Sequence, residues 1–102
     1  MDNVGDEKQV KQKRSIIDLD REKELEEFRN ILKTYGGRSF IWRILERCGI
    51  YSAGVTDALE TFRELGKRDI GLWVLEEIFS ASPDIYTTIR NEASERMERI
   101  NG

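Results

Sequence analysis

The sequence of 102 residues contains no histidine, one cysteine and one proline. Without histidine, the Ser-His-Asp triads, the histidine-containing zinc sites and the most common general base of enzymes are excluded. The single cysteine, Cys48, excludes an intramolecular disulfide and the all-cysteine zinc sites. Because free cysteine is among the most buried residue types, we expect Cys48 to lie in the core rather than to act as a reactive thiol.

The overall composition predicts one soluble helical domain. Charged residues make up 36% of the chain and hydrophobic residues 38%, and the formal net charge is -3. A net negative charge argues against general coating of nucleic acid, which depends on a basic surface. The apolar runs are interrupted well before the roughly 18 residues that a membrane span requires, and the polar first residues do not resemble a signal peptide. We therefore expect a protein of a reducing compartment, with no membrane contact.

The spacing of apolar residues predicts an all-α fold, a small bundle of four to five helices with an extended polar N-terminal arm. The first two expected helices run from Asp18 or Asp20 to about Thr34 and from Arg38 or Ser39 to Cys48. The next two run from Val55 to a break at Gly66 and from Lys67 or Asp69 to about Ser80. The last runs from Pro83 to about Ile100 and is capped by Ser82. The fourth of these helices is apolar nearly all round, so we expect it to be central. Gly71 within it predicts a close approach by the helix that carries Trp42.

Residues 1–17 form the N-terminal arm, and residues 18–102 form the helical domain. The arm has no sustained apolar periodicity, so we expect it to be disordered unless it is bound to a partner. Its few apolar residues are candidate contacts with a neighbouring subunit or another partner. They are Val4, Val10, Ile16 and Ile17.

No motif in the chain predicts a reaction. Gly66-Lys67 suggests a phosphate-binding loop, but Thr61 stands where that motif needs a glycine, and Arg68 stands where it needs serine or threonine. Neighbouring acids such as Glu76 and Glu77 are expected on exposed helix faces, where they are solvated rather than catalytic. We predict no catalytic residue, no metal ligand and no cofactor, so the protein is not expected to be an enzyme.

One group of basic residues gathers near the two glycine turns of the sequence. It comprises Arg38, Arg43, Arg47, Lys67 and Arg68, with Arg63 beside them. These side chains are candidates for contact with DNA phosphates. Alternatively, Arg43 and Arg68 pair with helix acids such as Glu46 and Glu64, which the net negative charge of the chain favours.

Two tryptophans follow these glycine turns. Trp42 and Trp73 are expected to be core or helix-contact residues, and a protruding Trp42 would instead be an anchor for a partner protein. Trp42 is therefore a further candidate partner-binding residue.

The glycine and tryptophan blocks carry a resemblance to a known family. The blocks are Gly37 to Ile50, Gly66 to Leu75, Pro83-Asp84 with Tyr86, and Arg90 to Ala93. Together they resemble a family of small tailed-phage proteins that is named after a protein of a Bordetella phage and is encoded among virion morphogenesis genes. The resemblance covers about residues 28–96. Members of this family usually have arginine where Lys67 stands, a change that keeps the charge but not bidentate hydrogen bonding.

This resemblance implies a phage or prophage origin and a place in the head, portal or tail module, and it implies no catalytic residue. We expect a virion-associated structural or assembly protein that binds portal, tail or capsid proteins in several symmetric copies. It would lie in the virion, and in the host cytoplasm during assembly. The alternative is a DNA-binding helical protein of packaging or gene regulation, which would use the basic residues named above.

Overall fold

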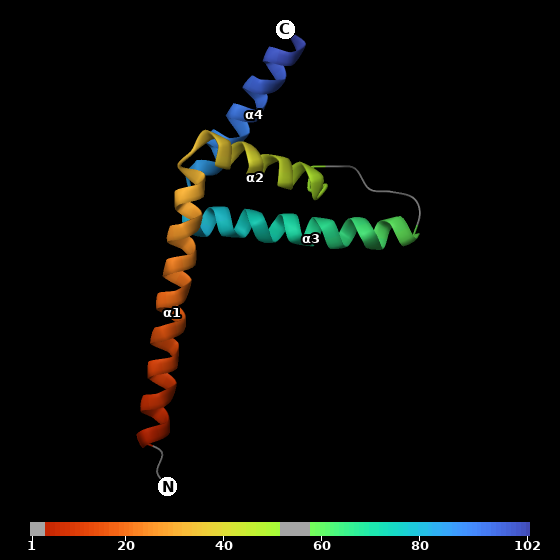
Figure 1. Cartoon of the computed structure of the whole chain (residues 1–102). Helices are drawn as coiled ribbons and strands as arrows, with labels where there is room; N and C mark the ends of the chain where they lie inside the picture. Colours follow the sequence, from red (N-terminus) through yellow and green to blue (C-terminus); the bar gives the residue numbers. More distant parts are fainter. Residues whose placement is uncertain (1–3, 52–57) are drawn as a thin grey trace.

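The computed structural model describes residues 4–51 and 58–102, with side chains for 7–51 and 62–102. Four helices make up this part of the chain, which contains no strand, and the predicted all-α fold is therefore confirmed (Figure 1). The helices are α1 (Val4–Leu32), α2 (Tyr35–Arg47), α3 (Ala58–Ala81) and α4 (Ile85–Asn101). Helices α2 and α3 lie beside each other and cross the upper end of α1, while α4 continues past them.

Helix α1 has 29 residues and is therefore about 43 Å long. The predicted helix start at Asp18 or Asp20 is wrong, because residues 4–17 continue the same helix. Lysine, glutamine and arginine in this stretch are good helix formers, and a missing apolar stripe signals a lack of burial rather than a lack of helix. Every described side chain from Glu7 to Asp20 is exposed. That the arm becomes ordered by binding a partner stays a prediction. The projecting helix raises the radius of gyration to 19.3 Å, against about 13 Å for a compact chain of this length.

The core takes one fully buried side chain from each helix. These four are Leu32, Leu45, Ile78 and Ile89, each with at most 2% of its surface exposed. The buried residues around them are Leu25, Ile41, Cys48, Val74, Ala81 and Ala93. The expected burial of Cys48 is therefore confirmed.

The turn between α1 and α2 is tighter than expected. Helix α2 begins at Tyr35, three residues before the predicted Arg38, because Thr34 acts as its N-cap. The Thr34 hydroxyl accepts a hydrogen bond from the Gly37 amide at 3.0 Å and donates one to the Ile31 carbonyl at 3.1 Å. The helix ends at Arg47 with Cys48 as its C-cap, and Gly49 follows at a positive φ of 72°, so the predicted end at Cys48 is one residue late.

Helix α3 is one continuous helix, so the predicted break at Gly66 is wrong, and the predicted start at Val55 lies outside the described residues. We expected this helix to be central, but much of its surface is not covered by the other helices. Its neighbours cover one stripe, which holds Gly71, Val74, Ile78 and Ala81. Leu75, beside this stripe, is partly buried. Six further apolar residues are at least 46% exposed, and they are Phe62, Leu65, Ile70, Leu72, Trp73 and Phe79.

The predicted close approach at Gly71 is confirmed. A Cβ atom placed on Gly71 would lie 2.5 Å from Ile50 Cγ2 and 2.8 Å from Cys48 Cβ. Both neighbours belong to the segment that ends α2. The glycine therefore allows this segment to lie directly against the backbone of α3.

Helix α4 begins two residues later than the Ser82-Pro83 signal predicts. Its N-cap position is Asp84, which makes no side-chain capping bond, and Ser82 contributes its carbonyl to the Ile85 amide at 3.2 Å. The first half of α4 enters the core, whereas Met97 and Ile100, expected on its apolar face, are 57% and 78% exposed. The reason is that α4 extends beyond the other three helices (Figure 1).

The two glycines inside α3 provide a matched test of this packing. Gly71→Ala should lower the free energy of unfolding by about 1–3 kcal/mol, because the new methyl group collides with Ile50 and Cys48. Gly66→Ala should raise it by about 0.5–1 kcal/mol, because no atom lies within 4 Å of the added Cβ and alanine favours the helix. Urea unfolding followed by circular dichroism measures both changes. Equal effects of the two substitutions would contradict the close approach.

Candidate protein-binding site

A groove of about 320 Å³ lies where α1, α2 and α3 meet. Its base and walls are apolar and its rim carries three carboxylates. The lining residues are Phe28 and Ile31 of α1, Ile41 and Ile44 of α2, and Trp73 and Val74 of α3, with Glu24, Glu27 and Glu77 on the rim. Ile31 and Trp73 are exposed, so the groove is accessible from solvent.

Helix phase explains why large apolar side chains remain exposed in this groove. On α3, Val74 faces the core, and its neighbour Trp73 is therefore turned towards the groove, with 58% of its surface exposed. On α1, Leu32 is buried and the preceding Ile31 is 48% exposed. Large apolar residues that gather in one exposed depression are typical of a surface that binds another protein.

An ion pair fixes one side of the rim. Arg21 of α1 donates two hydrogen bonds to the carboxylate of Glu77 of α3, one of them at 2.9 Å to Oε1 and the other to Oε2. The hydrogen bonds from Arg21 lower the pKa of Glu77, so this carboxylate is ionised at neutral pH. Arg21 is also 3.4 Å from Glu24. With one guanidinium against three carboxylates, the rim presents net negative charge.

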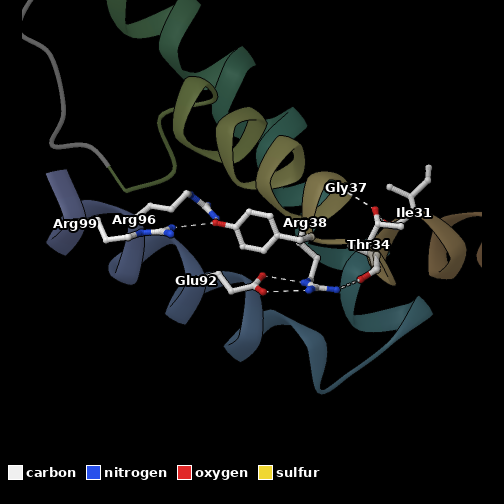
Figure 2. A network of polar contacts seen from close by, with 9 residues as sticks. Ile31, Thr34, Gly37, Arg38, Glu92, Arg96 and Arg99 are labelled. Carbon is white, nitrogen blue, oxygen red and sulfur yellow. Dashed lines mark hydrogen bonds and ion pairs between the residues drawn. The ribbon is translucent and has the colours of Figure 1, made fainter.

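Arg38, the first candidate for DNA contact, is held inside the molecule. Its guanidinium donates to both carboxylate oxygens of Glu92 of α4, at 2.8 and 3.0 Å, and to the Leu32 carbonyl at the end of α1, at 2.9 Å (Figure 2). Only 15% of the Arg38 side chain and 17% of the Glu92 side chain are exposed. These bonds lower the pKa of Glu92. Arg38 therefore joins three helices.

Other arginines act in the same way at helix ends. Arg29 Nε donates to the Ala81 carbonyl, the last residue of α3, at 2.6 Å. Arg96 and Arg99 of α4 donate to the Tyr35 hydroxyl at 2.9 and 3.4 Å, and the bond from Arg96 is the main cause of the lowered pKa of Tyr35. The bond from Arg29 to Ala81, like the bond from Arg38 to Leu32, gives a partner to a backbone carbonyl that a helix end leaves open.

The remaining basic candidates do not gather with Arg38. Arg43 lies over the Phe40 ring, with 5.2 Å between its Cζ atom and the ring centroid, and Lys67 pairs with Glu64 at 3.0 Å. Arg47 and Arg68 are exposed. Arg47 is nine residues beyond Arg38, about 13 Å along α2. Lys67 and Arg68 precede Gly71, which contacts the end of α2 near Arg47.

Trp42 is a helix-contact residue rather than a protruding anchor. It is half-buried, packs against the core and stacks on Tyr51 with 5.2 Å between ring centroids. The Tyr51 hydroxyl is 2.6 Å from that of Tyr86 on α4, and burial is the main cause of the raised pKa of Tyr51. The exposed tryptophan is Trp73. Its exposure could have been found from the helical spacing of Gly71, Val74 and Ile78, which defines the covered stripe.

The candidate contacts of the N-terminal arm lie on the free part of α1, residues 4–20, in which every described side chain is exposed. Val10, Ile16 and Ile17 are 46%, 58% and 64% exposed. The side chain of Val4 lies outside the described part. Sequence analysis missed Leu19, which is 68% exposed and lies next to this group.

Within the described ranges, no three acidic, cysteine or histidine residues come together in a way that could hold a metal ion. The helices of this part of the chain are all too short or too polar to span a bilayer.

Comparison with known proteins gives one match. A family model described as Bbp19-like phage protein matches residues 28–91. The matched stretch runs from the last turns of α1 into α4 and includes the apolar residues of the groove, whereas the free part of α1 lies outside it. Searches of curated proteins and of solved structures gave no match.

The Arg38–Glu92 ion pair makes a pH-dependent contribution to stability. At neutral pH, Glu92→Gln should lower the free energy of unfolding by about 1–2 kcal/mol. Because Arg38 holds the pKa of Glu92 below its ordinary value of 4.5, the stabilisation is complete above that value and is lost as the pH falls through the lowered pKa of the folded state. The difference between the wild-type protein and E92Q should therefore shrink in acid.

Urea unfolding from neutral pH to about pH 3, below the ordinary glutamate range, measures this difference. Glu95→Gln is the control, because Glu95 is an exposed glutamate of the same helix. Its substitution should change the free energy of unfolding by less than about 0.5 kcal/mol. A difference between wild type and E92Q that stays constant with pH would contradict the ion pair.

Proposed function

The chain belongs to the Bbp19-like phage protein family, and we propose that it is a structural or assembly protein of the head, portal or tail module. In this proposal it acts in the virion, or in the infected cell during assembly, by binding other phage proteins in several symmetric copies. It carries out no reaction and needs no cofactor.

The groove supports this proposal most directly. It presents the exposed indole of Trp73 and the exposed side chain of Ile31 inside an acidic rim. Tryptophan is enriched among the residues that contribute most to protein–protein affinity, because it buries a large area at a low entropic cost. A matching partner segment would carry apolar side chains that fill the groove beside Trp73 and Ile31.

The position of the groove in the sequence adds support. Its six apolar residues all lie within the stretch that matches the family, as does Glu77. Only Glu24 and Glu27 precede that stretch. A surface built mostly from the shared stretch is a better candidate for a shared role than the free part of α1, which lies outside it.

The carboxylates support a binding role rather than catalysis. The two that are most enclosed, Glu77 and Glu92, are each held by an arginine that lowers the pKa. A carboxylate with a lowered pKa is a poor general acid or base near neutral pH, where catalytic groups need values close to 7. The chain also contains no histidine, the most common general base.

The DNA-binding alternative has weaker support. It requires the basic candidates to reach phosphates together, but Arg38 is bound to Glu92 and Lys67 to Glu64. Arg43, Arg47 and Arg68 remain as exposed cations. The net charge of -3 also opposes association with a polyanion.

Alanine substitutions at two similarly exposed residues distinguish a binding role of the groove from a general effect of changing the protein surface. Trp73→Ala should reduce incorporation of the chain into phage particles at least tenfold, because it removes the anchor of the groove. Met97→Ala on α4 should incorporate like wild type, since Met97 lies outside the groove although its exposure, 57%, matches the 58% of Trp73. Tagged variants expressed during infection, followed by mass spectrometry of purified particles, measure the incorporation.

Thermal unfolding of both variants should show changes below about 0.5 kcal/mol, which separates binding from folding. Incorporation of W73A at the wild-type level would overturn the role of the groove. Salt-dependent binding of the purified chain to DNA, lost when Arg47 and Arg68 are replaced by glutamine, would favour the alternative function instead.

A further inference from the structure

Residues 8–27 of α1 carry their charges in two opposite halves. Residues 8–17, the basic half, hold four basic residues and no acidic residue. Residues 18–27, the acidic half, hold six acidic and two basic residues. The formal charges of the two halves are therefore +4 and −4, and both halves belong to one uninterrupted helix.

Exposed apolar side chains mark the junction between the two halves. Ile16, Ile17 and Leu19 are 58%, 64% and 68% exposed, and no described side chain from Glu7 to Asp20 is even half-buried. The nearest tertiary contact along α1 is the Arg21–Glu77 pair. Most of the stability of a helix in a protein comes from packing of an apolar face against another element. In the single chain this stretch of α1 has no such packing.

We propose that α1 pairs in an antiparallel manner with α1 of a second copy of this chain, about a two-fold axis near Ile17 and Asp18. This arrangement places the basic half of each copy across from the acidic half of the other, whereas a parallel arrangement would place like charges together. The interface is isologous, since the same stretch of α1 serves both copies.

The register follows from the position of the axis. Lys8, Lys11 and Lys13 lie level with Glu27, Glu24 and Glu22 of the second copy. At the centre, Ile16 lies level with Leu19 of the second copy. The overlap of residues 8–27 is about 30 Å long. Oppositely directed helix dipoles add a further favourable contribution.

This inference does not rest on the proposed function. The basic half and the acidic half both precede the stretch that matches the family, and the pairing leaves Trp73 to another partner. The two claims can therefore be refuted separately. The oligomeric state of the purified chain tests the pairing of α1, and incorporation into particles tests the role of the groove.

Two charge-reversal variants test the pairing. Lys8→Glu with Lys11→Glu and Lys13→Glu makes both halves acidic, and Asp18→Lys with Asp20→Lys and Glu22→Lys makes both halves basic. All six side chains are exposed, so the core is unaffected. In sedimentation equilibrium at low ionic strength the wild-type chain should dimerise, each variant alone should dimerise at least tenfold more weakly, and an equimolar mixture of the two should regain the dimer. Added salt should weaken wild-type association.

A wild-type chain that stays monomeric at every concentration would overturn the proposal, as would variants that dimerise like wild type or a mixture that stays monomeric. Dimers lost in W73A but kept in both charge variants would assign the interface to the groove. Circular dichroism of each variant confirms that the helices are retained.

Cross-linking tests the orientation. Lys8→Cys mixed with Glu27→Cys should form disulfide-linked heterodimers on oxidation, while Lys8→Cys alone should not link to itself. Cys48 is buried and does not compete. Efficient linkage of Lys8→Cys to itself would indicate a parallel pair and contradict the proposal.

Discussion

The structure depends on a core to which each helix contributes one fully buried side chain: Leu32, Leu45, Ile78 and Ile89. Burying a side chain of this size stabilises the fold by about 1.5–3 kcal/mol. A core this small covers only one stripe of each helix. The exposed surfaces of α3 and α1 are a direct consequence, because the apolar residues beside each buried stripe have no helix to cover them.

Arginine side chains connect the helices outside the small core. Arg38 bonds to the end of α1 and to Glu92 of α4, Arg29 bonds to the end of α3, and Arg21 joins α1 to Glu77. These contacts fix the angle at which α1 crosses α2 and α3, and that crossing forms the groove. The basic residues that could suggest nucleic-acid binding are thus partly used within the fold.

The features that could be predicted from the sequence are local ones. The burial of Cys48, the end of α2 near Gly49 and the close approach at Gly71 each follow from one residue type and its neighbours. Apolar spacing gives the phase of a helix but not how many neighbours cover it, so Trp73 was expected inside and lies exposed. Pairing of Arg38 with Glu92, 54 residues apart, depends on the tertiary fold. The start of α1 was predicted too late, because the charged helix formers of residues 4–17 lack the apolar stripe that marks a packed helix.

We propose that this phage protein works through exposed surfaces that bind other proteins. Cryo-electron microscopy of intact particles of the phage that encodes it tests this most directly. The account predicts density for repeated copies of the chain, with Trp73 covered by another virion protein. Mature particles that lack the chain, or copies in which Trp73 faces solvent, would contradict the account.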